Sequence, residues 1–170
     1  MKKEQTNIIA AIVENKPGVL YQVSNMFRCR GFNIESISVG PTNQRDIARM
    51  TITVNGNEKV IEQVIKQLNK LIDVIKVSRL DPARIVVREM ALVKANTPDA
   101  KARSDIINYA NIFRARVVDV SQESLMVEIT GDPEKVGAFI DLIRSFGVKE
   151  VARTGITALS RGIKSVRIEG

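Results

Sequence analysis

The two halves of this 170-residue chain repeat one order of predicted elements. This repeat limits the fold more than any other feature, because a repeated unit has to pack in the same way twice. It is visible in the letters at one strand-to-helix junction, where "VNGNEKVIEQV" in the first half corresponds to "ITGDPEKVGAF" in the second. We therefore predict two similar supersecondary units.

The first half predicts the order strand, helix, strand, strand, helix, strand. "NIIAAIV" (residues 7–13) is an almost unbroken apolar run, which is typical of a strand buried on both faces. Pro17 suits the first turn of a helix that ends at Gly31. "NIESISVG" and "DIARMTITVNG" predict two strands, Asn57 begins a second helix, and "DVIKVSRL" predicts a closing strand.

The same order restarts after Asp81-Pro82. "RIVVREMALVKA" predicts a strand, and Thr97-Pro98-Asp99 is a good helix start. "ARVVDV" and "SLMVEITG" predict two strands, a helix is expected from Asp132 to Phe146, and "VKEVAR" predicts a last strand.

The fold class is therefore expected to be α+β, with two tandem ferredoxin-like βαββαβ units at residues 1–81 and 82–170. Each unit would place two helices on one face of a four-stranded antiparallel sheet. A strand as apolar as residues 8–13 needs protein on the other face too, supplied by the second unit, another chain or both.

Composition excludes several classes of function. Histidine is absent, which removes the commonest general acid–base and the usual zinc ligand. The single Cys29 has no partner for a disulfide or a metal site and is expected to be a buried or half-buried thiol. The sequence shows no export signal and no apolar stretch long enough to span a bilayer, so we expect no membrane association and a cytoplasmic location.

A nucleic-acid partner is not expected, although the net charge is +7. The basic residues are scattered rather than gathered in a stripe. RNA-recognition domains share the βαββαβ order, but they stack bases on aromatic residues of their central strands, and "NIIAAIV" and "RMTITVNG" contain none. An enzyme using Glu14 and Glu35 is also disfavoured, because solvated or ammonium-binding carboxylates explain these residues better.

Two corners of the first unit differ from their counterparts in the second. The chain leaves the first strand through Asn15-Lys-Pro-Gly18 and leaves the first helix through Gly-Phe-Asn33, whereas the second half has "KANTPDA" and "FRARVV" at these places. Both corners could be ordinary turns, since asparagine, proline and glycine are common turn residues. Corners with a purely structural role would be expected to look more alike in the two copies.

The first corner has the chemistry of a carboxylate site. A helix start presents unpaired backbone N–H groups, Gly18 lets a ligand approach closely, and the Asn15 amide can orient it. Asn33 lies one helix length away, so both corners would share a ligand only across a symmetric interface between two chains. Such a site would bind an amino acid, with its apolar side chain between Val19, Leu20 and Ile34.

Nearly the whole chain resembles the regulatory (small) subunit of acetolactate synthase, also called acetohydroxyacid synthase. The resemblance is carried, in order, by "NKPGVLYQVSNMFRCRGFNIESISVGPT", "ARMTITV", "EKVIEQVIKQLNKLIDVIKV", "REMALVK", "IFRARVVDV", "EITGDPEKVGAFIDLIR" and "VARTGITALSRG". The first unit resembles an ACT domain, a module that binds small amino acids at the interface of paired domains. A free-standing amino-acid sensor that regulates another enzyme or transcription remains the alternative.

The resemblance implies a chain without a catalytic centre or a cofactor of its own. Its partner would be a large catalytic subunit that uses thiamine diphosphate, magnesium and FAD to condense pyruvate with pyruvate or 2-oxobutyrate. The small subunit would raise that activity and confer feedback inhibition by valine, and sometimes by leucine or isoleucine. Residues 1–81 would pair as an ACT homodimer, and residues 82–170 would contact the catalytic subunit.

The resemblance also implies the effector site. It would be formed by Asn15, Pro17, Gly18, Val19 and Leu20 of one chain together with Asn33 and Ile34 of the other. The C-terminal stretch, with Arg153 and Arg161, is expected to add a contact surface for the catalytic subunit, and a last strand followed by a fraying tail is the alternative.

Overall fold

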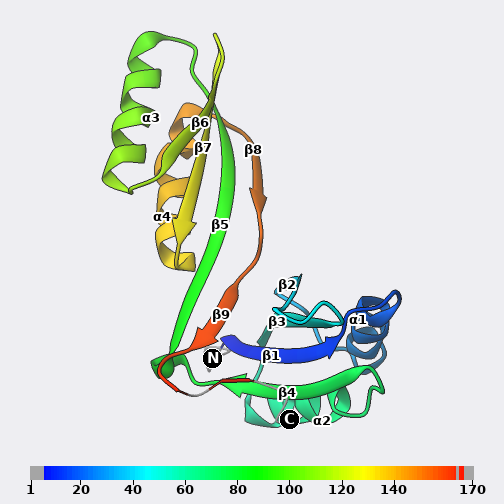
Figure 1. Cartoon of the computed structure of the whole chain (residues 1–170). Helices are drawn as coiled ribbons and strands as arrows, with labels where there is room; N and C mark the ends of the chain where they lie inside the picture. Colours follow the sequence, from blue (N-terminus) through cyan, green and yellow to red (C-terminus); the bar gives the residue numbers. More distant parts are fainter. Residues whose placement is uncertain (1–5, 164, 167–170) are drawn as a thin grey trace. The chain divides into compact units, whose positions relative to one another are not determined.

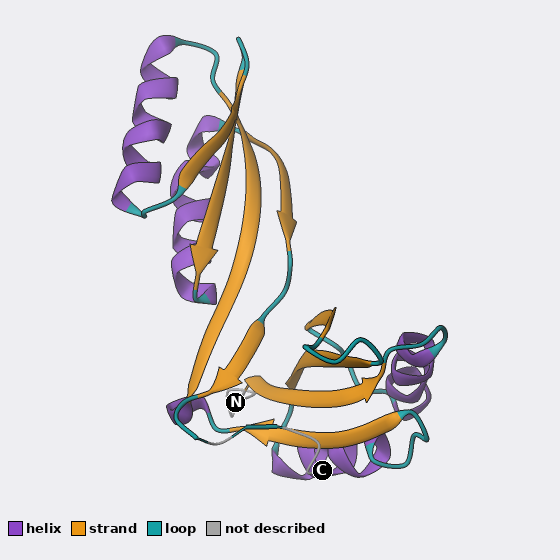
Figure 2. Cartoon of the chain, viewed as in Figure 1, coloured by secondary structure: helices purple, strands orange, loops and turns teal. Residues whose placement is uncertain are grey.

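The computed structural model describes residues 6–163, 165 and 166 (Figures 1 and 2). The chain divides into two compact units. The first comprises the residues up to Val86 together with the segment from Ile156, and the second comprises Val87–Gly155. The predicted α+β class and the tandem βαββαβ order are confirmed.

The first unit is a four-stranded antiparallel sheet with the strand order β2-β3-β1-β4. Its elements are β1 (Thr6–Glu14), α1 (Val19–Arg30), β2 (Ser36–Pro41), β3 (Ile47–Asn55), α2 (Glu58–Leu68) and β4 (Val74–Leu80). A 3-10 turn, η1 (Pro82–Arg84), follows β4 and leads into β5.

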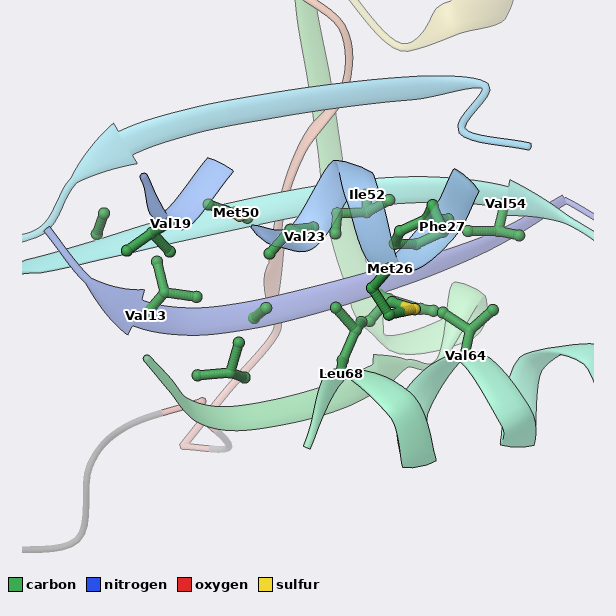
Figure 3. Packing of buried hydrophobic residues seen from close by; sticks show 14 of the residues in the cluster. Val13, Val19, Val23, Met26, Phe27, Met50, Ile52, Val54, Val64 and Leu68 are labelled. Carbon is green, nitrogen blue, oxygen red and sulfur yellow. The ribbon is translucent and has the colours of Figure 1, made fainter. Parts of the chain in front are cut away.

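Both helices pack on one face of this sheet. The apolar side chains of β1 that face them alternate with those that face away, as the pleat of a strand requires. Figure 3 shows the resulting core, in which β1 and β3 meet α1 and α2. Its members include Val13, Met50, Ile52, Val54, Val19, Val23, Met26, Phe27, Val64 and Leu68.

The other face of the first sheet is covered by the chain's own last segment. Ile8, Ala10 and Ile12 point to this face and are buried. Across it run residues 156–158, held because Ser38 Oγ donates to the carbonyl oxygen of Ile156 (3.0 Å) and Arg49 Nη2 donates to that of Ala158 (2.9 Å). The expectation that protein covers this face is therefore confirmed.

This cover explains why the division differs from the predicted domains, 1–81 and 82–170. The segment contains a short strand, β9 (Thr157–Ser160), which pairs with β5 and stands outside the two βαββαβ units; a strand in this stretch was the alternative to a contact surface. Arg161 donates to the carbonyl oxygens of Arg84 (2.7 Å, from its backbone N–H) and Ile85 (3.1 Å, from Nε). These contacts join the segment from Ile156 to the first unit, although it follows the second unit in the sequence.

The second unit repeats the topology, with the strand order β6-β7-β5-β8. Its elements are β5 (Ile85–Asn96), α3 (Ala100–Ile112), β6 (Arg116–Val120), β7 (Ser124–Gly131), α4 (Pro133–Ile143), the 3-10 turn η2 (Arg144–Phe146) and β8 (Val148–Arg153). Its core lies between the sheet and α3 and α4, and includes Val93, Ile106, Leu125, Val127, Phe139 and Ile143. On the opposite face, Leu92, Met126 and Ala152 line a shallow hollow of about 110 Å³ with Lys94 and Glu150.

Three further observations concern the functional expectations. Cys29 is exposed, so the expectation of a buried or half-buried thiol is wrong; it lies on the outer side of α1. No helix among the described residues is long and apolar enough to span a membrane. Arg153 forms an ion pair with the buried Glu89, and so has a structural role inside the second unit.

Candidate functional site

The β1–α1 corner, residues 15–20, follows directly from the end of β1. Asn15 is attached to the turn between β2 and β3 by two hydrogen bonds. Its backbone N–H donates to the carbonyl oxygen of Asp46 (2.7 Å), and its Nδ2 donates to that of Arg45 (2.9 Å). The Asn15 side chain is thereby fixed, and its acceptor Oδ1 is left for a ligand.

The start of α1 is open. Its cap residue, Gly18, has φ of 91°, a left-handed conformation that glycine adopts without strain, and it makes no side-chain capping bond. The other three α-helices of the described residues are capped by Asn57, Asp99 and Asp132, whose side chains accept from backbone N–H groups of the first turn. A Cβ added at Gly18 would meet no atom within 4 Å, so the space beside Gly18 is open.

This geometry suits an anion. The first N–H groups of a helix lack intrahelical acceptors, and the helix dipole places partial positive charge there. The first turn of α1 contains no acidic residue that would compete for them. A carboxylate can therefore accept hydrogen bonds from the N–H groups of Val19 and the residues that follow it.

A buried carboxylate behind the corner was not foreseen from the sequence. Asp73 precedes β4, and its side chain is only 7% exposed. Its Oδ1 lies 2.6 Å from Lys16 Nζ, and its Oδ2 accepts from Gln22 Nε2 (2.9 Å). Lys16 Nζ also lies 2.7 Å from Glu14 Oε2, and the hydrogen bonds to Asp73 and Glu14 raise the pKa of Lys16 to about 12.

The apolar residues predicted at the corner have different surroundings. The Val19 side chain is buried in the core of the first unit, so only the backbone of this residue can face a ligand. Leu20 is 49% exposed and Pro17 is exposed, which leaves both side chains accessible. Tyr21, which was not among the predicted residues, is 71% exposed beside them.

The second predicted corner lies beyond the other end of α1. Gly31 ends the helix in a left-handed conformation (φ 67°). Asn33 Nδ2 donates to Glu35 Oε1 (2.7 Å), and Ile34 packs partly buried against the core. Asn33 and Glu35 line a cavity of about 480 Å³ together with Arg30 and Asn57. Oxygen atoms of both residues are thus available to an ammonium group.

One chain does not bring the two corners together. α1 has 12 residues, so its ends are about 18 Å apart at ~1.5 Å per residue. The pairing of Asn15–Leu20 with Asn33 and Ile34 across two chains therefore stays a prediction. No group of three or more cysteine, aspartate or glutamate side chains in the described part of the chain is arranged to hold a metal ion.

Two family models match the chain. The "AHAS small subunit-like ACT domain" matches residues 9–76, and "Small subunit of acetolactate synthase" matches residues 88–162. A probable acetolactate synthase small subunit of Methanothermobacter thermautotrophicus is 57% identical over 161 residues, which cover 95% of this chain and 96% of that protein. The acetolactate synthase small subunit of Mycolicibacterium smegmatis is 47% identical over 161 residues, with 95% and 94% covered.

A solved structure is similar over the same range. The crystal structure of an acetolactate synthase small subunit from Thermotoga maritima matches this one with a TM-score of 0.87 and 43% sequence identity. The match covers 93% of this chain and 98% of that one.

Proposed function

Because the chain belongs to the family of acetolactate synthase small subunits, as its sequence predicted, we propose that it activates a large catalytic subunit and makes it sensitive to valine. The reaction would be the condensation of pyruvate with pyruvate or 2-oxobutyrate, in the biosynthesis of valine, leucine and isoleucine. The catalytic subunit would hold the thiamine diphosphate, magnesium and FAD, and both subunits would work in the cytoplasm.

The valine site would be the β1–α1 corner. The open start of α1 is the observation that carries this proposal, because Gly18 leaves the first N–H groups without a side-chain cap. Valine's carboxylate would accept hydrogen bonds from these groups. Its ammonium would donate to oxygen atoms of Asn15 and, from a second chain, of Asn33 and Glu35.

The site would be completed by a homodimer. The isopropyl group of valine would lie between Leu20 of one chain and Ile34 of the other. β2 forms an edge of the first sheet, where Val39 is 46% exposed, and Leu20 and Tyr21 are exposed on α1. An edge strand with an exposed apolar side chain is suited to pairing with a second copy, and Leu20 and Tyr21 add exposed apolar surface on α1.

The expected affinity is modest. Valine has about eight heavy atoms, and at roughly 0.7 kcal/mol per atom its binding free energy would be near 6 kcal/mol. This corresponds to a dissociation constant of about 0.1 mM. Inhibition further requires that valine bind one arrangement of the two-subunit assembly more tightly than another.

Calorimetric titration of valine into the purified chain tests the proposal. We expect sub-millimolar binding that is lost in Asn15→Ala and in Asn33→Ala, because the two residues belong to the two halves of the site. Asn111→Ala changes an exposed asparagine of α3 and should bind like the wild type. Leucine and isoleucine are titrated in parallel, since they differ from valine by one methylene group.

A second measurement tests the regulatory role. The chain is added to the catalytic subunit of the same organism, and acetolactate formation is followed with and without valine. Stimulation that valine reverses, and that Asn15→Ala makes insensitive to valine, supports the proposal. Valine binding without any effect on the catalytic subunit contradicts it.

A further inference from the structure

We propose, on the basis of the proposed function, that Asp73 is a positioning residue for the effector site. It does not touch the ligand in this arrangement. It holds the β1–α1 corner in the shape that receives the carboxylate of an amino acid.

Asp73 contacts the chain on both sides of Gly18. Its Oδ1 binds the ammonium of Lys16 (2.6 Å), which lies in the turn, and its Oδ2 binds Gln22 (2.9 Å), which lies in the first turns of α1. Its backbone carbonyl oxygen accepts from the N–H of Glu14 at the end of β1 (2.9 Å). One nearly buried residue thus joins the strand, the turn and the helix that form the corner.

The corner needs such an external restraint. Glycine has more accessible backbone conformations than other residues, so fixing Gly18 in one of them costs more conformational entropy, and a preorganised site binds more tightly than one that has to be ordered by its ligand. A side-chain cap at the helix start would also order the turn, but it would occupy the N–H groups that the carboxylate needs. Asp73 restrains the corner through Lys16, Gln22 and the N–H of Glu14, and leaves those N–H groups of the helix start free.

The test uses Asp73→Asn in the full chain, because this substitution removes the charge and keeps the size of the side chain. We expect the dissociation constant of valine to rise about tenfold, as for the loss of a hydrogen bond to a charged group. In the absence of valine, the amide hydrogens of Asn15 and Gln22, which bond to Asp46 and Gly18, should exchange faster. The amide of Phe32, beyond the other end of α1, should not change.

A double-mutant cycle separates positioning from a general loss of stability. Lys16→Met removes one of the two groups through which Asp73 acts, and Lys16 is half exposed, so the fold should tolerate the change. Because the inference has Asp73 act partly through Lys16, Asp73→Asn should weaken valine binding less in the Lys16→Met background than in the wild type. Asp141→Asn, in an exposed ion pair of the second unit, is the matched control and should bind like the wild type.

Two results overturn the inference. One is wild-type affinity together with wild-type amide exchange in Asp73→Asn. The other is an equal loss of affinity in both backgrounds, since Asp73 would then not act through Lys16. If the wild-type chain bound no valine, the proposed function would fail, and the exchange of Asn15 and Gln22 would still decide whether Asp73 positions the corner.

Discussion

The β1–α1 corner of the first unit and the β5–α3 corner of the second make the same backbone contact, but only the second has a side-chain cap at its helix start. In both, the first residue after the central strand donates its N–H to the neighbouring hairpin: Asn15 to Asp46 (2.7 Å) and Thr97 to Glu123 (2.9 Å). The helix that follows begins with Gly18 in one case and with Asp99 in the other. Asp99 accepts from the N–H of Ala102 (2.7 Å), so the second helix start is satisfied within the chain.

A side chain also attaches the second corner to its neighbouring hairpin. Arg103 Nη2 donates to the carbonyl oxygens of Ser121 (2.9 Å) and Gln122 (2.6 Å) in that hairpin. In the first unit the Asn15 side chain makes the corresponding bond. The same scaffold thus has a capped helix start in the second unit, which adds stability, and an uncapped one in the first. The uncapped start leaves hydrogen-bond donors that the proposed effector would use.

The sheet faces away from the helices differ as well. In the first unit, residues 156–158 cover this face, and Ala158 is buried there. In the second, Ala152 is exposed and Leu92 and Met126 are half-buried. The first face therefore contributes to the stability of its own unit, while the second is the more accessible surface for a partner.

Removing the cover should have the largest effect on stability. A chain ending at Gly155 would expose the face formed by Ile8, Ala10 and Ile12. Burying an isoleucine side chain contributes about 1.5–3 kcal/mol, so we expect the free energy of unfolding of the first unit to fall by roughly 3–6 kcal/mol. Urea unfolding measures this change.

The matched control is Ile163→Ser in the full chain, which changes a fully exposed side chain after β9 and should unfold like the wild type. An unchanged urea midpoint for the chain ending at Gly155 would contradict the role assigned to the segment. If that shorter chain also fails to activate the catalytic subunit, the loss follows from the damaged first unit and does not by itself locate a contact surface.

An acidic residue at position 18, like Asp99 at the start of α3, should abolish valine binding. Gly18→Asp places a carboxylate at this position, as Asp99 does at the start of α3, although Gly18 is left-handed and Asp99 is extended. The new carboxylate would lie beside the helix start and repel that of valine, and juxtaposed like charges cost several kcal/mol, so affinity should fall more than about 100-fold. Calorimetry measures the loss.

Gly18→Asn controls for backbone strain, because asparagine has nearly the same size, no charge and a better tolerance of the left-handed conformation than other residues. It should retain clearly more binding than Gly18→Asp. Equal affinities of the two variants would show that strain at Gly18, and not charge at the helix start, controls binding.

The fold was predictable because its signals are local. The apolar run at residues 7–13 lies within β1, and Gly31 and Asp132 are the cap residues at the end of α1 and the start of α4. Pro17, expected in the first turn of α1, lies one residue before its cap, Gly18, because the helix begins only at Val19. Asn15 and Gly18 could be singled out in the same way, because the second half of the sequence served as an internal comparison. The pairing with Asn33 stays a prediction, since it depends on a second chain.

The missed features are contacts between distant segments. Nothing near Asp73 in the sequence indicates that its carboxylate binds Lys16 and Gln22. Nothing in "TGITALSRG" indicates that residues 156–158 return to the first sheet, because Ser38 and Arg49, which hold them, are typical surface residues of strands. Such contacts are fixed by topology, and a periodic pattern does not encode them.

Loss of the side-chain cap of α3 should reduce the stability of the second unit without changing valine binding. Asp99→Ala removes the cap of α3, and the loss of such a cap costs about 1 kcal/mol. Thermal unfolding should therefore show a small decrease for the second unit, and calorimetry an unchanged affinity for valine. A weaker affinity in Asp99→Ala would contradict the assignment of effector binding to the first unit alone.

The smallest expected effect is the change in stability caused by Lys16→Met. In the second corner, Pro98 occupies the position that Lys16 has in the first. Hydrogen bonds to Asp73 and Glu14 raise the pKa of Lys16 from 10.5 to about 12, so its charged form stabilises the folded state. Because the folded value is the higher one, this contribution is fully present below pH 10.5 and is lost as the pH rises through about 12. Urea unfolding of the wild type and of Lys16→Met should differ by a constant amount below pH 10.5 and converge above it. Lys101→Met, on the exposed side of α3, should show no such convergence. A difference that persists for Lys16→Met at the highest pH would contradict the assignment of the stabilisation to the charge of Lys16.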